Sequence, residues 1–107
     1  MIKHALFVRL EAKPGKEKDV IKFLQANFGL AQQEGTTPVW IALQLGPSTF
    51  GIFDAFADEA AREAHLKGPC ARALGVKAPK LLAQVPSIER MEVFGAKLPA
   101  EARKKSF

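Results

Sequence analysis

The sequence predicts a single α+β domain with a ferredoxin-like fold, and three observations lead to this prediction. Its length of 107 residues is enough for one hydrophobic core but too short for two independent ones. Four segments show the alternation of period two that is typical of β-strands, and stretches between them show helical spacing. The order strand, helix, strand, strand, helical segment, strand is the split β-α-β arrangement of an antiparallel sheet covered by helices.

The beginning of the chain predicts a long strand and then a helix. Apolar residues alternate with other side chains throughout residues 2–11. Pro14 interrupts this pattern, and apolar residues then recur at helical spacing with lysines on the far side. We therefore expect the first helix to run from about Gly15 to Phe28.

The middle of the chain predicts a β-hairpin. Residues 39–45, VWIALQL, alternate so that Trp40 lies on one face and Ile41 on the other. A short loop, residues 46–48, separates this strand from residues 50–56, so the two strands are expected to pair as antiparallel neighbours. The second of them is largely apolar on both faces, which predicts that both faces are covered.

The third strand leads directly into a helix that carries a histidine. Asp58 stands at the N-cap position, and the alanines that follow favour a helix. His65 lies four residues after Ala61, so it faces the sheet or its edge rather than the charged side of the helix. Gly68 marks the end of this helix.

The last third of the chain predicts two short helices, a strand and a tail. Residues 69–75, PCARALG, and residues 78–85, APKLLAQV, each have a proline in the first turn of an expected helix. Residues 88–95 alternate once more and form the last strand. We assign residues 1–98 to the domain and residues 99–107 to a charged tail, which is expected to contribute little to any pocket.

Charge argues against a nucleic-acid partner. The formal net charge is +5, but residues 99–107 supply a net +2 of it, with three basic residues against one acidic. Elsewhere basic and acidic residues are mixed, as in KPGKEKD, which is typical of a solvated face. The RNA recognition motif has the same element order, but Ser48 and Thr49 stand where its third strand has a basic residue and glycine.

Cysteine usage and the opening residues bear on the compartment. Cys70 is the only cysteine, so neither an intramolecular disulfide nor a cysteine-based zinc site can form, and we expect it to be a small buried hydrophobe. His4 and His65 lack the spacing of metal ligands, so no metal site is expected. The first residues, MIKHALFVRLE, lack the apolar run of a signal peptide or membrane span. We therefore expect a cytoplasmic protein with no membrane partner.

Three side chains stand out as candidates for a site. Asp54 is a carboxylate within an aromatic stripe and needs a partner, for which Arg9 and Arg90 are the candidates. His65 can serve as a base or as a hydrogen-bonded structural residue at the helix end. Trp40 fits the core or a subunit interface as well as a substrate platform.

Both faces of the predicted sheet are apolar, but the helices of one chain cover only one of them. A domain of this size has no further element for that face, and a second copy of the chain is its simplest cover. The sequence therefore predicts a homodimer.

Over nearly the whole body, the chain resembles the antibiotic biosynthesis monooxygenase family, whose members are dimeric α+β barrels. The resemblance is carried by the opening strand with KPGKEKDV, the QEGT turn before a tryptophan-containing strand, and two longer stretches, FGIFDAFADEAAREAHLKG and LLAQVPSIERMEVFGAKLP. It implies an apolar cavity between sheet and helices in each subunit. That cavity would hold an electron-rich aromatic, a quinol or polycyclic phenol, which itself reduces dioxygen without a flavin or metal cofactor.

The resemblance implies roles for four residues. The pocket would hold the aromatic by apolar contacts and hydrogen bonds and would supply a base. His65 and Asp54 are the catalytic candidates, and Trp40 and Phe53 are the candidates for substrate binding.

Differences from other members bear on the chemistry. The chain has no tyrosine, and its only asparagine, Asn27, lies on the first helix rather than the first strand. This argues against the asparagine, histidine and tryptophan arrangement of the haem-degrading members. A non-catalytic dimeric module that binds a small molecule, or a stress-related dimer, is the alternative function that the sequence leaves open.

Overall fold

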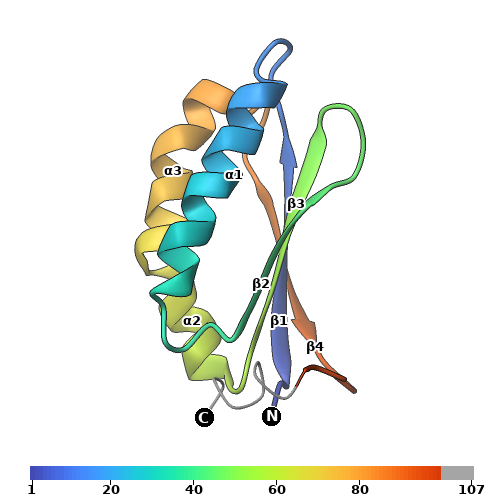
Figure 1. The fold of residues 1–107 in the computed structure, drawn as a ribbon, viewed down its shortest axis with the longest axis vertical. Coiled ribbons are helices and arrows are strands. Elements are labelled where there is room, and N and C mark those ends of the chain that lie inside the picture. The colour runs from blue at the N-terminus through green and yellow to red at the C-terminus, as the bar shows by residue number, and fades with distance from the viewer. Residues whose placement is uncertain (100–107) are drawn as a thin grey trace.

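The computed structural model describes residues 1–99, and within this range three helices cover one face of a four-stranded antiparallel sheet (Figure 1). In chain order the elements are β1 (His4–Glu11), α1 (Glu17–Gln32), β2 (Val39–Gln44), β3 (Thr49–Phe56), α2 (Glu59–Leu66), α3 (Pro69–Leu81) and β4 (Ser87–Glu92). The ferredoxin-like α+β fold is confirmed. No helix of this range is long and apolar enough to cross a membrane. Apart from Pro99, the tail predicted at residues 99–107 lies outside the described residues.

The strand order is β2-β3-β1-β4, so β3 and β1 are the central strands and the predicted hairpin places β2 at one edge. All three pairings are antiparallel. In this register Asp54 of β3 stands opposite Leu6 of β1 on one side and opposite Trp40 of β2 on the other. Side chains of directly paired residues share a face. Asp54, Leu6 and Trp40 therefore all lie on the face that the helices cover.

The main core fills the space between this face and the helices. It contains buried residues of β1, α1 and β3 together with Leu82, which follows α3: Val8, Leu10, Ala12, Val20, Leu24, Phe50, Ile52 and Leu82. Phe50 and Phe56 are among the largest fully buried side chains, as the apolar pattern of β3 predicted. Burial of such side chains contributes about 1.5 to 3 kcal/mol each to folding.

The first helix differs in its bounds from the expected residues 15–28. It begins at Glu17, because Gly15 has a φ of 83° and forms the turn that precedes the helix. It then continues past Phe28 to Gln32, since Ala31 is buried against the rest of the fold and extends the apolar stripe by one turn.

The prediction of two short helices after Gly68 is wrong, because residues 69–81 form one continuous helix, α3. Pro79 lies in its last turns, where its missing N–H leaves only the carbonyl group of Gly75 without its helical partner. The Nζ of Lys13 donates a hydrogen bond of 2.6 Å to the carbonyl oxygen of Pro79. This contact fixes the end of the helix to the loop after β1.

The other face of the sheet carries apolar side chains that no helix covers within residues 1–99. A small cluster of Ile2, Ala5 and Ala55 is covered there by Phe53, Met91 and neighbouring residues. Further along β2, Ile41 is 47% exposed and Leu43 is 38% exposed. We call this surface, formed by the odd-numbered residues of β1, β2 and β3, the outer sheet face.

Candidate functional site

A buried histidine between two carboxylates is the main polar feature of the helix-covered face. Nε2 of His65 lies 2.8 Å from Oδ2 of Asp54, and Nδ1 of His65 lies 2.6 Å from Oε1 of Glu34. The Thr37 hydroxyl donates to the same Glu34 oxygen at 3.1 Å. Asp54, His65 and Thr37 are all buried. We call Asp54, His65 and Glu34 the charge relay, because the three groups are in contact in series.

Three different elements bring the relay together. Asp54 lies at the centre of β3, and His65 lies in the last turn of α2, where the ring packs 5.4 Å from the ring of Phe56. The Asp58 carboxylate caps α2 by accepting a hydrogen bond of 2.8 Å from the N–H of Ala61, as predicted. Glu34 follows α1, and its second oxygen accepts a hydrogen bond from the N–H of Cys70.

The expected arginine partners of Asp54 are not its partners, so that prediction is wrong. Arg9 extends from the outer sheet face, where its guanidinium lies 5.7 Å from the centre of the Phe7 ring. Arg90 pairs instead with Glu63 of α2 at 3.1 Å. His65 takes the place that the sequence assigned to an arginine.

Burial and the close contacts shift the pKa values of the relay. Burial raises the pKa of Asp54, and the contact with His65 offsets this only in part. Burial would lower the pKa of His65, but Asp54 and Glu34 raise it above its ordinary value. Burial would raise the pKa of Glu34, and hydrogen bonds from His65 and Cys70 lower it instead. A protonated His65 between two carboxylates is therefore favoured.

An apolar cavity of about 260 Å³, which we call the inner cavity, lies next to the relay between the sheet and α3. It is lined by Leu6, Val8, Asn27, Trp40, Ile52, Asp54, His65, Leu66, Cys70, Ala71, Leu74, Gly75, Ala78, Val85, Pro86 and Ile88. Oδ1 of Asp54 and Oδ1 of Asn27 are buried and have no hydrogen-bond partner among residues 1–99. The cavity thus has apolar walls and two unpaired acceptors.

Cys70 lines the same cavity but is not a nucleophile. Burial, followed by the nearby Glu34 carboxylate, raises the pKa of its thiol to about 12. The thiol donates to the main-chain oxygen of Asn27 at 3.5 Å. Because only the thiolate is reactive, Cys70 serves as the small buried residue that the sequence predicted.

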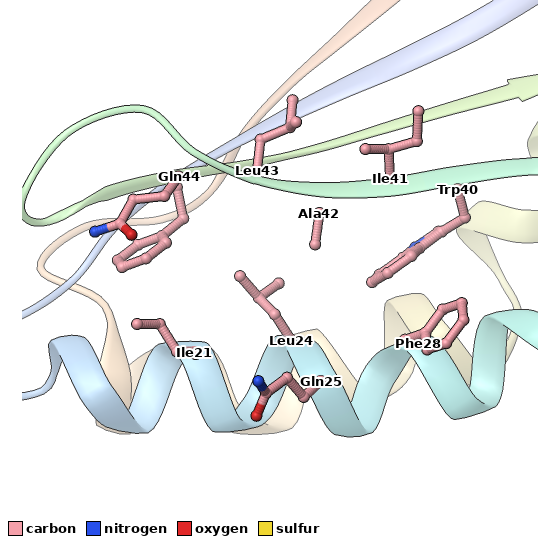
Figure 2. A pocket seen from close by; sticks show the side chains of 10 residues that line it. Ile21, Leu24, Gln25, Phe28, Trp40, Ile41, Ala42, Leu43 and Gln44 are labelled. Carbon is pink, nitrogen blue, oxygen red and sulfur yellow. The ribbon is translucent and has the colours of Figure 1, made fainter.

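A second, more open hollow of about 510 Å³ lies between α1 and the edge strand β2, and we call it the outer groove. Figure 2 shows Trp40 reaching from β2 toward Phe28 of α1, while Ile41 and Leu43 point away from the helix. The two aromatic rings stack with their centres 6.0 Å apart. None of the described residues that line this groove has a titratable side chain, so its walls offer apolar contacts rather than acid-base chemistry. Trp40 lines both hollows.

The structure brings together three of the four predicted site residues. Asp54, His65 and Trp40 line the inner cavity. Phe53 does not, because it lies on the outer sheet face with Ile2 and its neighbours. This position corrects the expectation that Phe53 shares a pocket with Asp54.

Two functional candidates, Glu34 and Asn27, were not singled out from the sequence. Glu34 lies in the QEGT turn, where no periodicity indicates which way a side chain points. Asn27 did carry a signal, since it stands three residues after Leu24 and four before Ala31 on the buried stripe of α1. Among residues 1–99, no group of three or more His, Cys, Asp or Glu side chains is arranged to hold a metal ion.

Comparison with known proteins shows which solved structures have a similar fold. No protein-family model matches the chain, and no curated protein matches it either. Among solved structures, PA3566 from Pseudomonas aeruginosa has a TM-score of 0.76 at 18% identity, covering 89% of this chain and 97% of that one. An antibiotic biosynthesis monooxygenase has a TM-score of 0.73 at 16% identity, covering 86% of this chain and 99% of that one. The chain therefore has the fold of the antibiotic biosynthesis monooxygenases, as its residues indicated.

A much nearer relative is the NE2512 protein from Nitrosomonas europaea, whose crystal structure is described as that of a protein of unknown function. It is 57% identical to this chain, with a TM-score of 0.91, over 94% of this chain and 97% of the other. The chain belongs to the same protein family as NE2512.

Proposed function

We propose that the chain is a cofactor-independent monooxygenase that oxidises a small electron-rich aromatic, a quinol or phenol, with dioxygen in the inner cavity. The observation that carries this proposal is the carboxylate of Asp54, which is 1% exposed and has one oxygen unpaired in an apolar cavity. An aromatic hydroxyl group is the kind of donor that such an oxygen lacks. The shared fold is consistent with this chemistry.

Asp54, rather than His65, is the base in this proposal. Both ring nitrogens of His65 already face carboxylates, whereas Asp54 lines the cavity and its Oδ1 has no hydrogen-bond partner among residues 1–99. The raised pKa of Asp54 brings its basicity closer to that of a phenolate, whose pKa is about 10 in tyrosine. His65 holds the carboxylate in place and connects it to Glu34.

The overall reaction is balanced without another reductant. One quinol and one dioxygen give one hydroxyquinone and one water, so one oxygen atom enters a ring C–H bond and the other leaves as water. Conversion of the quinol to a quinone supplies two of the four electrons, and hydroxylation of the C–H bond supplies the other two. Asp54 removes the phenolic proton, which makes the aromatic electron-rich enough to reduce dioxygen, and can return it when the O–O bond breaks.

The size of the inner cavity limits the substrate. Its volume of about 260 Å³ lies just below the usual range of about 300 to 1,000 Å³ for ligand pockets. Aromatics of one or two rings are therefore favoured over larger polycyclic phenols.

Oxygen consumption on mixing with a panel of quinols and phenols tests the proposal. Asp54→Asn should lower the rate by about a hundredfold or more while the protein remains folded, because the amide cannot accept the proton. Asp19→Asn, which changes an exposed carboxylate on α1, is the matched control and should oxidise at the parent rate. Binding without any oxygen consumption would instead identify the chain as a non-catalytic module.

We also propose that two chains pair through the outer sheet face to form a homodimer. Apolar side chains on this face, Ile41 and Leu43 among them, remain partly exposed in one chain. A second copy would cover them with an identical surface.

A further inference from the structure

We propose that Asn27 is a ligand-positioning residue of the inner cavity, where its side-chain amide binds a second hydroxyl group of the aromatic that Asp54 deprotonates. This inference rests on the proposed function for the choice of cavity. It concerns recognition, and its test does not depend on oxidation.

The placement of Asn27 is the first argument. Asn27 is 2% exposed and lines the inner cavity from α1, whereas Asp54 lines it from the sheet. Its Oδ1 has no hydrogen-bond partner among residues 1–99. The amide group therefore reaches the cavity from a different wall than the carboxylate does.

The contacts that Asn27 makes within the fold do not explain why this position has an amide side chain. Cys70 contacts Asn27 through the main-chain oxygen, an interaction that any residue at this position would offer. Leu24 and Ala31 on the same stripe show that an apolar side chain suits this face of α1. Leucine also has a higher helix propensity than asparagine, and it would leave no buried acceptor unpaired. A ligand hydroxyl supplies the hydrogen-bond donor that residues 1–99 do not give to Oδ1 of Asn27.

The polar groups of the cavity then define the ligand. Both nitrogens of His65 and the thiol of Cys70 are already engaged, so Oδ1 of Asp54 and Oδ1 of Asn27 are the side-chain acceptors of the cavity that have no partner among residues 1–99. Two acceptors on different walls suit an aromatic with two donors better than an aromatic with one. The structure thus assigns a role in selectivity to Asn27: its amide makes the cavity bind dihydroxy aromatics more tightly than their monoethers.

A ligand-by-residue double-mutant cycle tests this assignment. The probes are catechol, resorcinol and hydroquinone, each compared with its monomethyl ether under anaerobic conditions, with binding followed by NMR titration. The parent protein should bind one or more of the diols about three- to tenfold more tightly than the matching ether, the worth of one hydrogen bond. In Asn27→Leu this preference should disappear, because the diol then loses the hydrogen bond that the ether already lacks.

Gln25→Leu is the matched control, since Gln25 carries the same amide on the same helix but lines the outer groove. It should keep the parent preference. Asn27→Ala provides a second variant in case leucine does not pack, and both variants are first checked by circular dichroism and thermal unfolding.

Three results would overturn the assignment: no diol preference in the parent protein, no binding of any probe, or an unchanged preference in both folded Asn27 variants. Oxygen consumption with the same diols under aerobic conditions tests the proposed function separately. If the diols bind with the expected preference but are not oxidised, the proposed function fails while the assignment of Asn27 stands.

Discussion

His65 joins two carboxylates from distant parts of the chain, Asp54 in the sheet and Glu34 in a turn. One protonated ring therefore offsets part of the cost of burying Asp54 and also fixes the turn that follows α1. Removing the ring would leave Asp54 without its one close cationic neighbour among residues 1–99. We expect His65→Ala to destabilise the fold by about 3 kcal/mol or more, the range for breaking a buried pair.

The pH dependence of stability gives a sharper prediction for His65. Its pKa is higher in the fold than its unfolded value of about 6.5, so its contribution is complete below that pH and is lost as the pH rises through the folded pKa. The melting temperature should therefore decrease as the pH rises from about 6.5 to about 8.5. This window lies above the pKa values of carboxyl groups in the unfolded chain and below most of the cysteine titration.

A His65→Gln variant should show a flatter profile over this window when unfolding is followed by circular dichroism. Parallel profiles for the parent protein and the His65→Gln variant would contradict the role of His65.

Among the elements, α2 is short, and its first turn depends on Asp58. Asp58→Ala removes the acceptor for the Ala61 N–H and should lower the free energy of unfolding by about 0.5 to 2 kcal/mol. Because α2 carries His65, the same change should also weaken the relay, which a denaturant titration and the oxygen assay can measure together. An unchanged midpoint would show that packing alone holds the helix.

The helix α3 covers the inner cavity with small residues, and Gly75 is the most accessible of them. A Cβ at Gly75 would meet no atom within 4 Å, and the same holds for Gly29 on the solvent side of α1. Both Gly→Ala changes should therefore stabilise the fold by about 0.5 to 1 kcal/mol.

Gly75→Leu and Gly29→Leu then separate the cavity from the helix. Only the leucine at position 75 adds a side chain to a residue that lines the inner cavity, so only this variant should bind the aromatic probes more weakly. Equal affinity in the two variants, measured by NMR titration, would place the ligand elsewhere.

For the whole molecule, the outer sheet face predicts the assembly. Light scattering should give the mass of a homodimer at micromolar concentration. Ile41→Glu would place a charge on this face and should give a monomer, whereas Val76→Glu, on α3 and already 71% exposed, should leave the dimer intact. A monomeric parent protein with a cooperative thermal transition would exclude the dimer.

The sequence predicted the fold because alternation and helix caps are local signals. Asp58 and His65 could be placed from spacing alone, and the apolar pattern of β3 indicated the burial of Phe50 and Phe56. The continuity of α3 could not be foreseen, because whether Pro79 ends a helix depends on how near the helix end already lies.

The composition of the site was harder to foresee. The partner of Asp54 depends on which side chains of other elements share its face. Arg9 and His65 were both possible from composition, and only the register of β1 against β3 puts Arg9 on the opposite side. Glu34 and Asn27 come from α1 and the turn after it, and their distances to Asp54 depend on the tertiary packing.

Trp40 also gives the molecule an optical property. It is the only tryptophan in a chain without tyrosine, so nearly all of the near-ultraviolet fluorescence arises from a single indole. That indole lines both the inner cavity and the outer groove and stacks on Phe28. An electron-rich aromatic that enters either hollow would quench or shift this emission, so the unlabelled protein carries its own reporter of occupancy.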